Sequence, residues 1–266
     1  MKPSLVTQGS LEPDVARLVA AEDRHFWFCA RNHAIEKLIR QIIANLRSGY
    51  HVLEVGCGTG NVLRVLETTC TRGTVVGLEL SWERLRFARQ RVTTPLVQGD
   101  LHRPPFKTPF DLIGLFDVLE HVPEDVRVLK DLSALLAPQG VLLLSVPAHP
   151  RLWSYFDEAS SHYRRYTLDN LGRALTSAGY RIEYLTQYMA SLFPLMWISR
   201  KLTARHRAAT AAQNFQHAWR LAQHDLSVVP VLNSFLFFLL RMEVPLLVRR
   251  YRLPIGTSLL AVARKG

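Results

Sequence analysis

The stretch His51-Val52-Leu53-Glu54-Val55-Gly56-Cys57-Gly58-Thr59-Gly60 decides the fold of this chain. Its first half predicts a buried strand over Val52–Val55, and its glycines predict a loop. A helical pattern begins at Asn61. A parallel α/β sheet builds a nucleotide-type pocket from this order of strand, glycine loop and helix. Glycine lets the backbone approach a ligand closely, and a helix start presents unpaired N–H groups to it.

The spacing of the glycines separates this loop from other nucleotide sites. It reads G-x-G-x-G, not the G-x-G-x-x-G of dinucleotide sites, and no Lys-Ser/Thr pair follows as in a phosphate loop. Glu54, inside the strand, can bind a cationic group such as the amino group of an amino acid. The stretch resembles the first motif of the Rossmann-like (class I) S-adenosylmethionine-dependent methyltransferases of small-molecule type. A glycine turn that serves only strand–helix packing is the alternative.

Three further stretches resemble motifs of that family in the same order. Glu79 ends a predicted strand over Thr74–Leu80, where a carboxylate can accept hydrogen bonds from both ribose hydroxyls; a solvated strand-end carboxylate is the alternative. Gly99-Asp100-Leu101 resembles the third motif, whose aspartate pairs with the adenine amino group. The run 110–122 resembles the fourth, which places Phe116 and Asp117 beside the methionine part of the cofactor. The resemblance implies S-adenosylmethionine as cofactor, S-adenosylhomocysteine as product, and the following binding residues: Glu54, Gly56, Cys57, Gly58, Thr59, Gly60, Glu79, Leu80, Asp100, Leu101, Phe116 and Asp117.

The segment 147–166 combines aromatic residues, histidines and arginines directly after a predicted fifth strand, Val141–Val146. We expect it to line the acceptor site; a plain aromatic-rich connection is the alternative. A histidine titrates near neutral pH and can serve as general base for a hydroxyl or carboxyl nucleophile. Arg164 or Arg165 could hold an anionic acceptor bidentately. The predicted catalytic residues are His149, His162, Tyr163 and Arg165, whereas Glu120 and His121 are expected to orient their loop.

The fold that the resemblance implies is α/β, a doubly wound seven-stranded Rossmann-like sheet. Four regions are predicted: an N-terminal tail and lid helix (1–46), the cofactor-binding core (47–189), a helical insertion or cap between the sixth and seventh strands (190–255), and the final strand (256–266). One helix is expected to run on from Glu22–Arg31 through Ile43. Its cluster Phe26-Trp27-Phe28 either packs on the domain edge or covers the pocket.

The sequence pattern of the insertion predicts three helices: Leu192–Leu202, a polar one near Ala208–Gln223, and an apolar one over Leu232–Arg249. The last of these is apolar on all sides over Phe235–Leu240. Two charged residues, Arg241 and Glu243, follow, and Pro245 interrupts the apolar run. This pattern favours a buried cap helix, a dimer contact or an interfacial segment over a membrane span.

Charge is concentrated at the C-terminal end. Of a formal net charge of +11, residues 196–266 hold eleven basic and two acidic side chains. A basic, apolar region predicts an anionic partner: a membrane surface, a substrate or nucleic acid. Nucleic acid is disfavoured, because the Asn/Asp-Pro-Pro-Tyr/Phe signature of base methylation and a nucleophilic cysteine are both missing after the fourth strand. We therefore predict an enzyme for a small-molecule or lipid-like acceptor that is anionic and apolar. A nucleic-acid methyltransferase and a non-enzymatic cofactor-binding scaffold are the alternatives.

The cysteines Cys29, Cys57 and Cys70 are odd in number and scattered, which predicts a reducing compartment and no metal site. Glu12, Asp14 and Arg17 interrupt any signal pattern at the N-terminus. The expected location is cytoplasmic, peripheral at the inner face of the membrane. A homodimer through the insertion is a further expectation.

Overall fold

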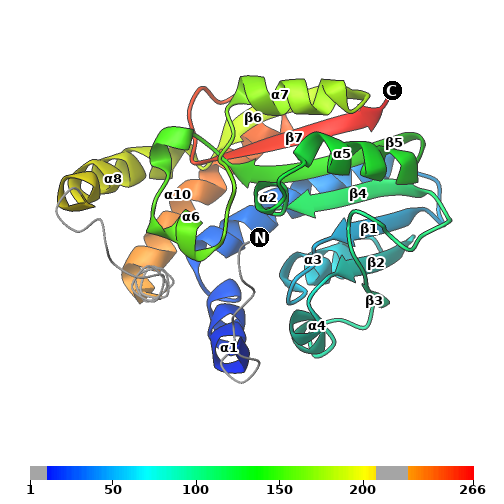
Figure 1. Ribbon diagram of the computed structural model, residues 1–266, viewed down its shortest axis with the longest axis horizontal. Helices are drawn as coiled ribbons and strands as arrows, with labels where there is room; N and C mark the ends of the chain where they lie inside the picture. Colours follow the sequence, from blue (N-terminus) through cyan, green and yellow to red (C-terminus); the bar gives the residue numbers. More distant parts are fainter. Residues whose placement is uncertain (1–10, 208–226) are drawn as a thin grey trace.

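The computed structural model describes residues 11–207 and 227–266, so the predicted tail before residue 11 and the predicted helix near Ala208–Gln223 lie outside the described residues. A seven-stranded sheet with the order β3-β2-β1-β4-β5-β7-β6 forms the centre of the molecule (Figure 1). Its strands are β1 (His51–Val55), β2 (Thr74–Glu79), β3 (Leu96–Gln98), β4 (Phe110–Phe116), β5 (Leu136–Pro147), β6 (Tyr180–Tyr188) and β7 (Ser258–Lys265). Only β7 runs antiparallel to its neighbours. The predicted fold class is confirmed.

The helices alternate with the strands along the chain. They are α1 (Leu11–Glu22), α2 (Phe26–Ala44), α3 (Asn61–Thr69), α4 (Trp82–Ala88), α5 (Asp125–Leu135), α6 (Tyr155–Ala159), α7 (Leu168–Ser177), α8 (Phe193–Arg207) and α10 (Pro230–Val248). Short 3₁₀ turns are η1 (Leu119–His121), η2 (Pro150–Leu152) and η3 (Ala190–Leu192). Both described helices of the insertion, α8 and α10, follow β6 and precede β7.

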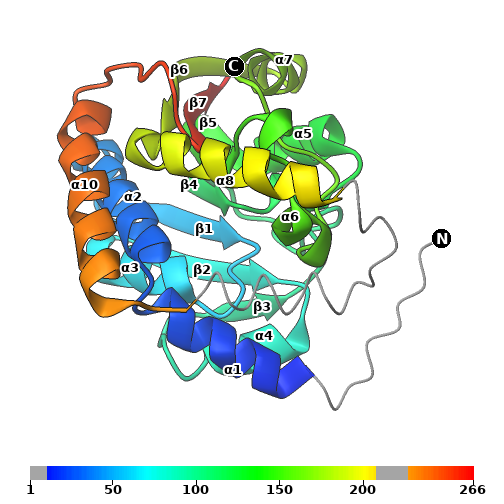
Figure 2. The same cartoon turned by 90° about the vertical axis from the view of Figure 1, so that its left-hand side faces the viewer.

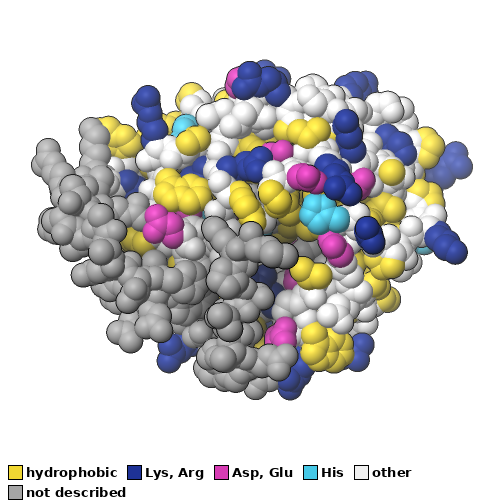
Figure 3. Space-filling model, viewed as in Figure 1, with side chains coloured by type: hydrophobic (Ala, Val, Ile, Leu, Met, Phe, Trp, Pro, Cys, Tyr) yellow, Lys and Arg dark blue, Asp and Glu magenta, His cyan; other side chains and the backbone are white. Residues whose placement is uncertain are grey.

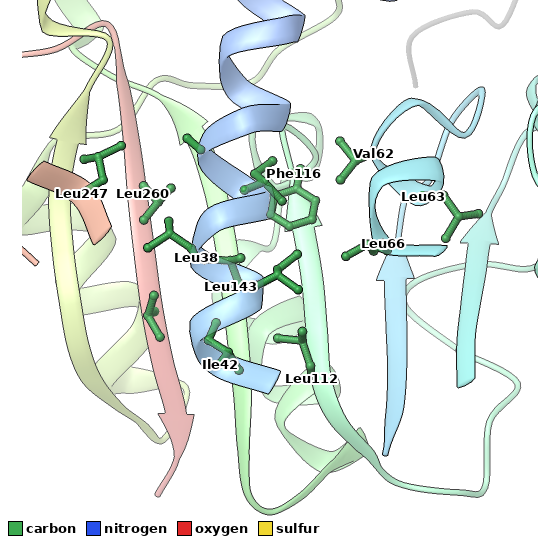
Figure 4. Close-up of a cluster of buried hydrophobic side chains, with 14 of the residues drawn as sticks. Leu38, Ile42, Val62, Leu63, Leu66, Leu112, Phe116, Leu143, Leu247 and Leu260 are labelled. Carbon is green, nitrogen blue, oxygen red and sulfur yellow. The ribbon is translucent and has the colours of Figure 1, made fainter. Parts of the chain in front are cut away.

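Two apolar layers hold the helices on the sheet. On one face, Leu38 and Ile42 of α2 lie one turn apart and pack against Leu112, Leu143 and Leu260 of the central strands (Figure 4). Helices α3 and α10 join the same layer. On the other face, α5 and α7 pack against the alternate residues of the same strands. The strands are therefore apolar on both faces, as central strands of a doubly wound sheet must be.

The register of the parallel strands fixes where a ligand can sit. Val55 lies beside Leu78 of β2 and Leu115 of β4, so these three strands end at one edge. The chain order reverses between β1 and β4, and ligands of such sheets bind outside the carboxyl ends at this reversal. In Figure 2 this edge faces the viewer, with α1, α6 and α8 around it.

The expectation of one helix running on from Glu22 is wrong. Helix α1 ends at Glu22, and α2 begins at Phe26. His25 caps α2 by accepting a hydrogen bond from Trp27 N at 3.4 Å. Asn233 of α10 also holds this junction, since its side chain accepts from Phe26 N (2.7 Å) and donates to the Arg24 carbonyl (2.9 Å). This break depends on a residue more than 200 positions away, so local periodicity did not reveal it.

The helix predicted over Leu232–Arg249 is confirmed as α10. Helix α10 continues through Pro245, and Arg249 N still donates to the Pro245 carbonyl at 3.1 Å. Proline removes one helical N–H, but tertiary packing of Val244 and Leu247 in the core compensates for it. Among the described residues, α10 is the one helix long and apolar enough to span a membrane by length and composition alone, and 28% of that apolar window is buried.

Glu243 connects the two described helices of the insertion. Its carboxylate is buried and accepts hydrogen bonds from Ala190 N (2.9 Å), Ser191 N (2.8 Å) and Ser191 Oγ (2.6 Å). These donors belong to η3, which leads directly into α8. A carboxylate within a largely apolar helix thus satisfies backbone groups at the start of its neighbour.

Candidate functional site

The glycine loop after β1 combines a packing requirement with open space. Gly56, Gly58 and Gly60 all have positive φ, at 71°, 55° and 82°. A Cβ on Gly56 would lie 2.5 Å from a methyl carbon of Val118, whereas a Cβ on Gly58 would meet nothing within 4 Å. Gly56 is therefore needed for close packing, and Gly58 leaves room at the loop surface for a ligand.

Glu79 holds the glycine loop from the end of β2. Its two carboxylate oxygens accept hydrogen bonds from Gly58 N (2.9 Å) and Ser81 N (2.8 Å). An ionised carboxylate has about four acceptor positions, so two remain for further donors such as a pair of hydroxyls. The structure thus places Glu79 and Gly58 in direct contact.

Glu54 is a buried carboxylate with an unsatisfied oxygen. It is 3% exposed, and its Oε2 has no hydrogen-bond partner among the described residues. Burial raises its pKa well above the ordinary value; nearby Arg31 opposes that shift, while Glu22 and Glu79 add to it. A buried unpaired carboxylate is costly, and a cationic ligand group would satisfy it.

Arg31 is a site residue that the sequence analysis missed. Its guanidinium pairs with Asp117 Oδ2 at 2.7 Å and donates to Asn61 Oδ1 at 2.9 Å. It also lies 5.1 Å from the ring centre of Trp27 and 5.3 Å from that of Phe28. The aromatic cluster of α2 therefore positions a cation that ties α2 to the ends of β4 and the glycine loop. Asp117 itself has a φ of 55°, the strained conformation often found at functional sites.

The end of α1 covers the glycine loop from the other side. The Glu22 carboxylate accepts from the Thr59 hydroxyl and pairs with Arg91, which also pairs with Asp23. The Glu22 carbonyl accepts from the Asn61 side chain at 3.2 Å. The end of α1 is thus held directly on the loop by polar contacts. No local sequence motif predicts these contacts.

The remaining predicted cofactor residues fall into two groups. Leu80 is 67% exposed and Asp100 is exposed, with its Oδ1 accepting from His102 N at 2.8 Å, while Leu101 is half-buried. Cys57 and Phe116 instead point their side chains into the core. For these two, only the backbone is left to face a ligand.

Asp157 organises the segment 147–166. It is fully buried, and its Oδ1 lies 2.7 Å from Arg165 Nε and 2.9 Å from His162 Nδ1. Its Oδ2 accepts from Ser154 N at 2.8 Å and so caps α6. Burial opposes ionisation, but the hydrogen bonds from His162 and Arg165 prevail and lower the pKa of Asp157 to about 2. The segment is therefore held in a defined conformation by the hydrogen bonds of Asp157.

The two arginines predicted to hold an anionic acceptor, Arg164 and Arg165, bind groups of the protein itself. Arg165 is buried between Asp157 and the Ala148 carbonyl, to which it donates at 3.2 Å. Arg164 pairs with Asp125 at 2.9 Å and donates to the Pro123 carbonyl at 2.6 Å. Both guanidinium groups are therefore held by groups of the protein, while Tyr163 is 54% exposed.

His149 lies apart from His162, at the meeting point of β6 and α8. Its Nε2 is 2.5 Å from Gln187 Oε1, and the ring of Phe193 is 5.1 Å away. Gln187 donates its own amide to the Pro254 carbonyl, so its oxygen faces His149 and must accept. The neutral ring of His149 therefore places its hydrogen on Nε2, and Nδ1 has no hydrogen-bond partner among the described residues.

A second cluster forms where η1 meets the segment 147–166. Tyr163 N donates to the Glu120 carbonyl at 2.7 Å, and the rings of His121 and His162 lie 4.7 Å apart, edge to face. Glu120 is 1% exposed and its Oε2 has no partner among the described side chains. Burial, helped by Asp117, raises the pKa of Glu120 well above its usual range, whereas His121 is exposed. This convergence goes beyond the loop-orienting role expected of Glu120 and His121.

Comparison with known proteins identifies the family of the chain. The profile of the methyltransferase domain matches residues 27–185. A demethylmenaquinone methyltransferase of Staphylococcus epidermidis is 25% identical over 176 residues, which cover 64% of this chain and 69% of the relative.

Two solved structures share the fold across nearly the whole chain. One is the methyltransferase bound to the Haloferax volcanii Trm112 activator (TM-score 0.60, 19% identity, 98% of this chain and 99% of that one). The other is Haemonchus contortus phosphoethanolamine N-methyltransferase 2 with phosphomonomethylethanolamine and S-adenosylhomocysteine (TM-score 0.60, 17% identity, 99% of this chain and 61% of that one).

Proposed function

The chain belongs to the S-adenosylmethionine-dependent methyltransferases, and from this premise we propose that it methylates a small-molecule or lipid-like acceptor that is anionic and apolar. The chain is thus an enzyme, which removes the scaffold alternative. S-adenosylmethionine supplies a methyl group on a positively charged sulfur that is already activated for transfer. The residues of the chain have to bind it, orient it and exclude water.

The unpartnered carboxylate oxygen of Glu54 carries the proposal for the cofactor site. An ammonium group of the cofactor would satisfy this oxygen, and Glu79 would take the ribose hydroxyls with its two free acceptor positions. Asp100 would accept the adenine amino group, with Leu80 and Leu101 at the ring. Helices α1 and α2 would exclude water, since Glu22 and Arg31 already hold them on the loop.

Calorimetry with S-adenosylhomocysteine tests this assignment. Glu54→Gln keeps the size of the side chain and removes its charge, so affinity should fall at least about tenfold, or 1.4 kcal/mol. Glu36→Gln, on the outer part of α2, is the matched control and should bind like the wild type. An unchanged dissociation constant in Glu54→Gln would remove Glu54 from the site.

On the acceptor side, His149 and His162 are the proposed general bases. The lone pair of His149 Nδ1 is free because Nε2 is held by Gln187. The Nε2 of His162 is free in the same way, because Asp157 holds Nδ1. Tyr163 would contribute an exposed aromatic surface to the acceptor, and Arg165 would position His162 through their shared partner Asp157.

The outer face of α10 supports an apolar acceptor or surface. Its exposed side chains recur at every third or fourth position and so form one stripe along the helix: Val231, Phe235, Phe238, Met242 and Leu246. A groove beside this stripe, between α2 and α10, is lined by His33, Lys37, Arg241 and Arg249 together with Val244 and Val248. A stripe of apolar side chains next to basic ones is the arrangement of an interfacial anchor.

We therefore propose that α10 lies on an anionic membrane surface. Basic side chains also gather over α5 and α7 on the opposite face of the sheet (Figure 3), so charge alone does not define the surface. The apolar stripe of α10 does, because it lies directly beside the basic groove. Each basic residue near an anionic leaflet contributes about 1 kcal/mol, enough for reversible attachment by several of them.

Sedimentation with liposomes tests this attachment. Binding should require anionic lipid, weaken with salt, and fall in the double variant Arg249→Ser with Arg252→Ser. The double variant Arg127→Ser with Arg173→Ser makes the same charge change on α5 and α7 and should leave binding intact. A protein that ignores anionic liposomes at low salt but forms a dimer in light scattering would assign the apolar stripe to a subunit contact instead.

Transfer of a labelled methyl group tests the acceptor class. The enzyme is incubated with labelled S-adenosylmethionine and either an extracted polar-lipid and quinone fraction, or transfer RNA and duplex DNA. Label should appear in the organic phase of the first mixture. Label in the nucleic acid alone would instead support the nucleic-acid alternative.

A further inference from the structure

The cluster at the carboxyl end of β4 has the composition of a metal site. Glu120 and His121 belong to η1, and His162 reaches them from the segment 147–166. One carboxylate oxygen and two ring nitrogens, one from each residue, all lie within 4.8 Å of one another. We propose that Glu120, His121 and His162 bind a divalent transition-metal cation. The spacing of these residues in the sequence predicted no such site.

Glu120 provides the strongest observation. Its side chain is buried to 1% exposure, yet Oε2 accepts no hydrogen bond from any described residue. The Tyr163 N–H, which lies close by, donates to the Glu120 backbone carbonyl and not to the carboxylate. A buried carboxylate oxygen almost always has a partner, so an oxygen without one needs an explanation. A cation between the carboxylate and the two rings provides it.

His162 is already oriented as a metal ligand. Its Nδ1 is held by the buried carboxylate of Asp157 at 2.9 Å. Metal-binding histidines almost always donate their other ring N–H to a carboxylate or a carbonyl, which fixes the tautomer and the ring direction. Nε2 of His162 is then the atom that is free to bind the cation, and with the cation bound His149 is the general base that remains of the two proposed.

His121 completes the cluster from the surface. The residue is exposed, and one of its ring nitrogens lies within 4.8 Å of the Glu120 oxygen and the His162 nitrogen. The ring stands edge to face against His162 at 4.7 Å between centroids. Two imidazoles therefore converge on one carboxylate.

The donor set indicates which ions fit. Imidazole nitrogen suits zinc, copper, iron and nickel, whereas magnesium and calcium prefer oxygen ligands. Bond lengths to nitrogen and oxygen of about 2.0–2.2 Å would draw the three donors slightly closer than they now lie. Three protein ligands also leave at least one position open for water or an acceptor oxygen, as catalytic metal sites do.

Direct binding to the full chain, without a polyhistidine tag and after treatment with a chelator, tests the proposal. Titration calorimetry should show one Zn²⁺ per chain, and Co²⁺ should give a visible absorption band from bound nitrogen ligands. Mg²⁺ should compete weakly. Glu120→Gln, His121→Ala and His162→Ala should each weaken binding of Zn²⁺ by about 100-fold or more, since changes to outer partners alone cost 10–100-fold.

His102→Ala is the matched control, because it removes the same ring from the loop after β3 and should bind Zn²⁺ like the wild type. Asp157→Asn keeps the shape of the outer partner and should weaken binding by about 10–100-fold. Thermal melting without metal shows whether each variant folds. The proposal is wrong if the folded wild type binds no Zn²⁺ or Co²⁺ at millimolar concentration, or if the three ligand variants bind as the wild type does. Neither outcome depends on methyl transfer.

Discussion

Replacing Gly58 by alanine separates the cost of backbone strain from the loss of a ligand contact. Gly58 has a φ of 55°, and a Cβ there would meet no atom within 4 Å. An L-residue in this left-handed region costs about 1–2 kcal/mol, with no clash to add. For a chain of this size that corresponds to a fall in Tm of about 2–8 °C. The variant should therefore fold and be only modestly less stable.

Cofactor binding by the same variant should fall much further. The added methyl group enters the space where the loop backbone must approach the ligand, so we expect a Kd for S-adenosylhomocysteine at least about tenfold higher, or 1.4 kcal/mol. Ligand at 100 times the wild-type Kd stabilises the wild type by about 2.7 kcal/mol, but a variant with a tenfold higher Kd by only about 1.4 kcal/mol. At least about half of the matching shift in Tm should therefore be lost. Calorimetry and thermal melting with and without ligand measure both effects.

Gly49→Ala is the control for this experiment. Gly49 also has positive φ (90°) and nothing within 4 Å of a Cβ, but it precedes β1 at the opposite edge of the sheet. It should show at least the same loss of stability with unchanged affinity. The reasoning is refuted if Gly58→Ala binds S-adenosylhomocysteine like the wild type, or if both variants lose affinity equally.

Three further predictions concern single side chains. Glu79→Ala should weaken binding of S-adenosylhomocysteine by about 1.5–3 kcal/mol in calorimetry, because it removes charged hydrogen bonds to the ligand and the acceptor of Gly58 N; unchanged affinity would contradict this. His149→Ala or His162→Ala should lower turnover at saturating cofactor by about 10²–10⁴-fold if that ring is the general base, and full activity in both would exclude the role. Alkylation at pH 8 should label Cys29 before Cys70 in the folded protein. Burial raises the pKa of Cys70 to about 11, so its reactive thiolate is scarce below that pH; equal labelling of both would contradict this.

The parts of the fold that follow from short-range patterns were predictable from the sequence. The strands over Val52–Val55, Thr74–Leu80 and Val141–Val146 each depend on neighbouring residues, through apolar runs bounded by turns. Glu79 could be placed because one helix and one strand separate it from the glycine loop in a regular α/β unit. Its contact with Gly58 follows from that unit.

The tertiary structure alone decided which polar side chains meet. Arg31 contacts Asp117 across 86 positions of sequence, and His162 meets His121 only because the segment 147–166 folds back onto η1. Periodicity reports which face of an element is buried, but not which distant element covers it. The break between α1 and α2 was missed for the same reason, since Asn233 supplies its partners. The sequence by itself determined the sheet, the glycine loop and the family of the protein. The order and packing of the strands determined how the N-terminal helices contact the glycine loop, and they formed the buried Asp157 network and the Glu120 cluster. These contacts exist only once distant segments are brought together.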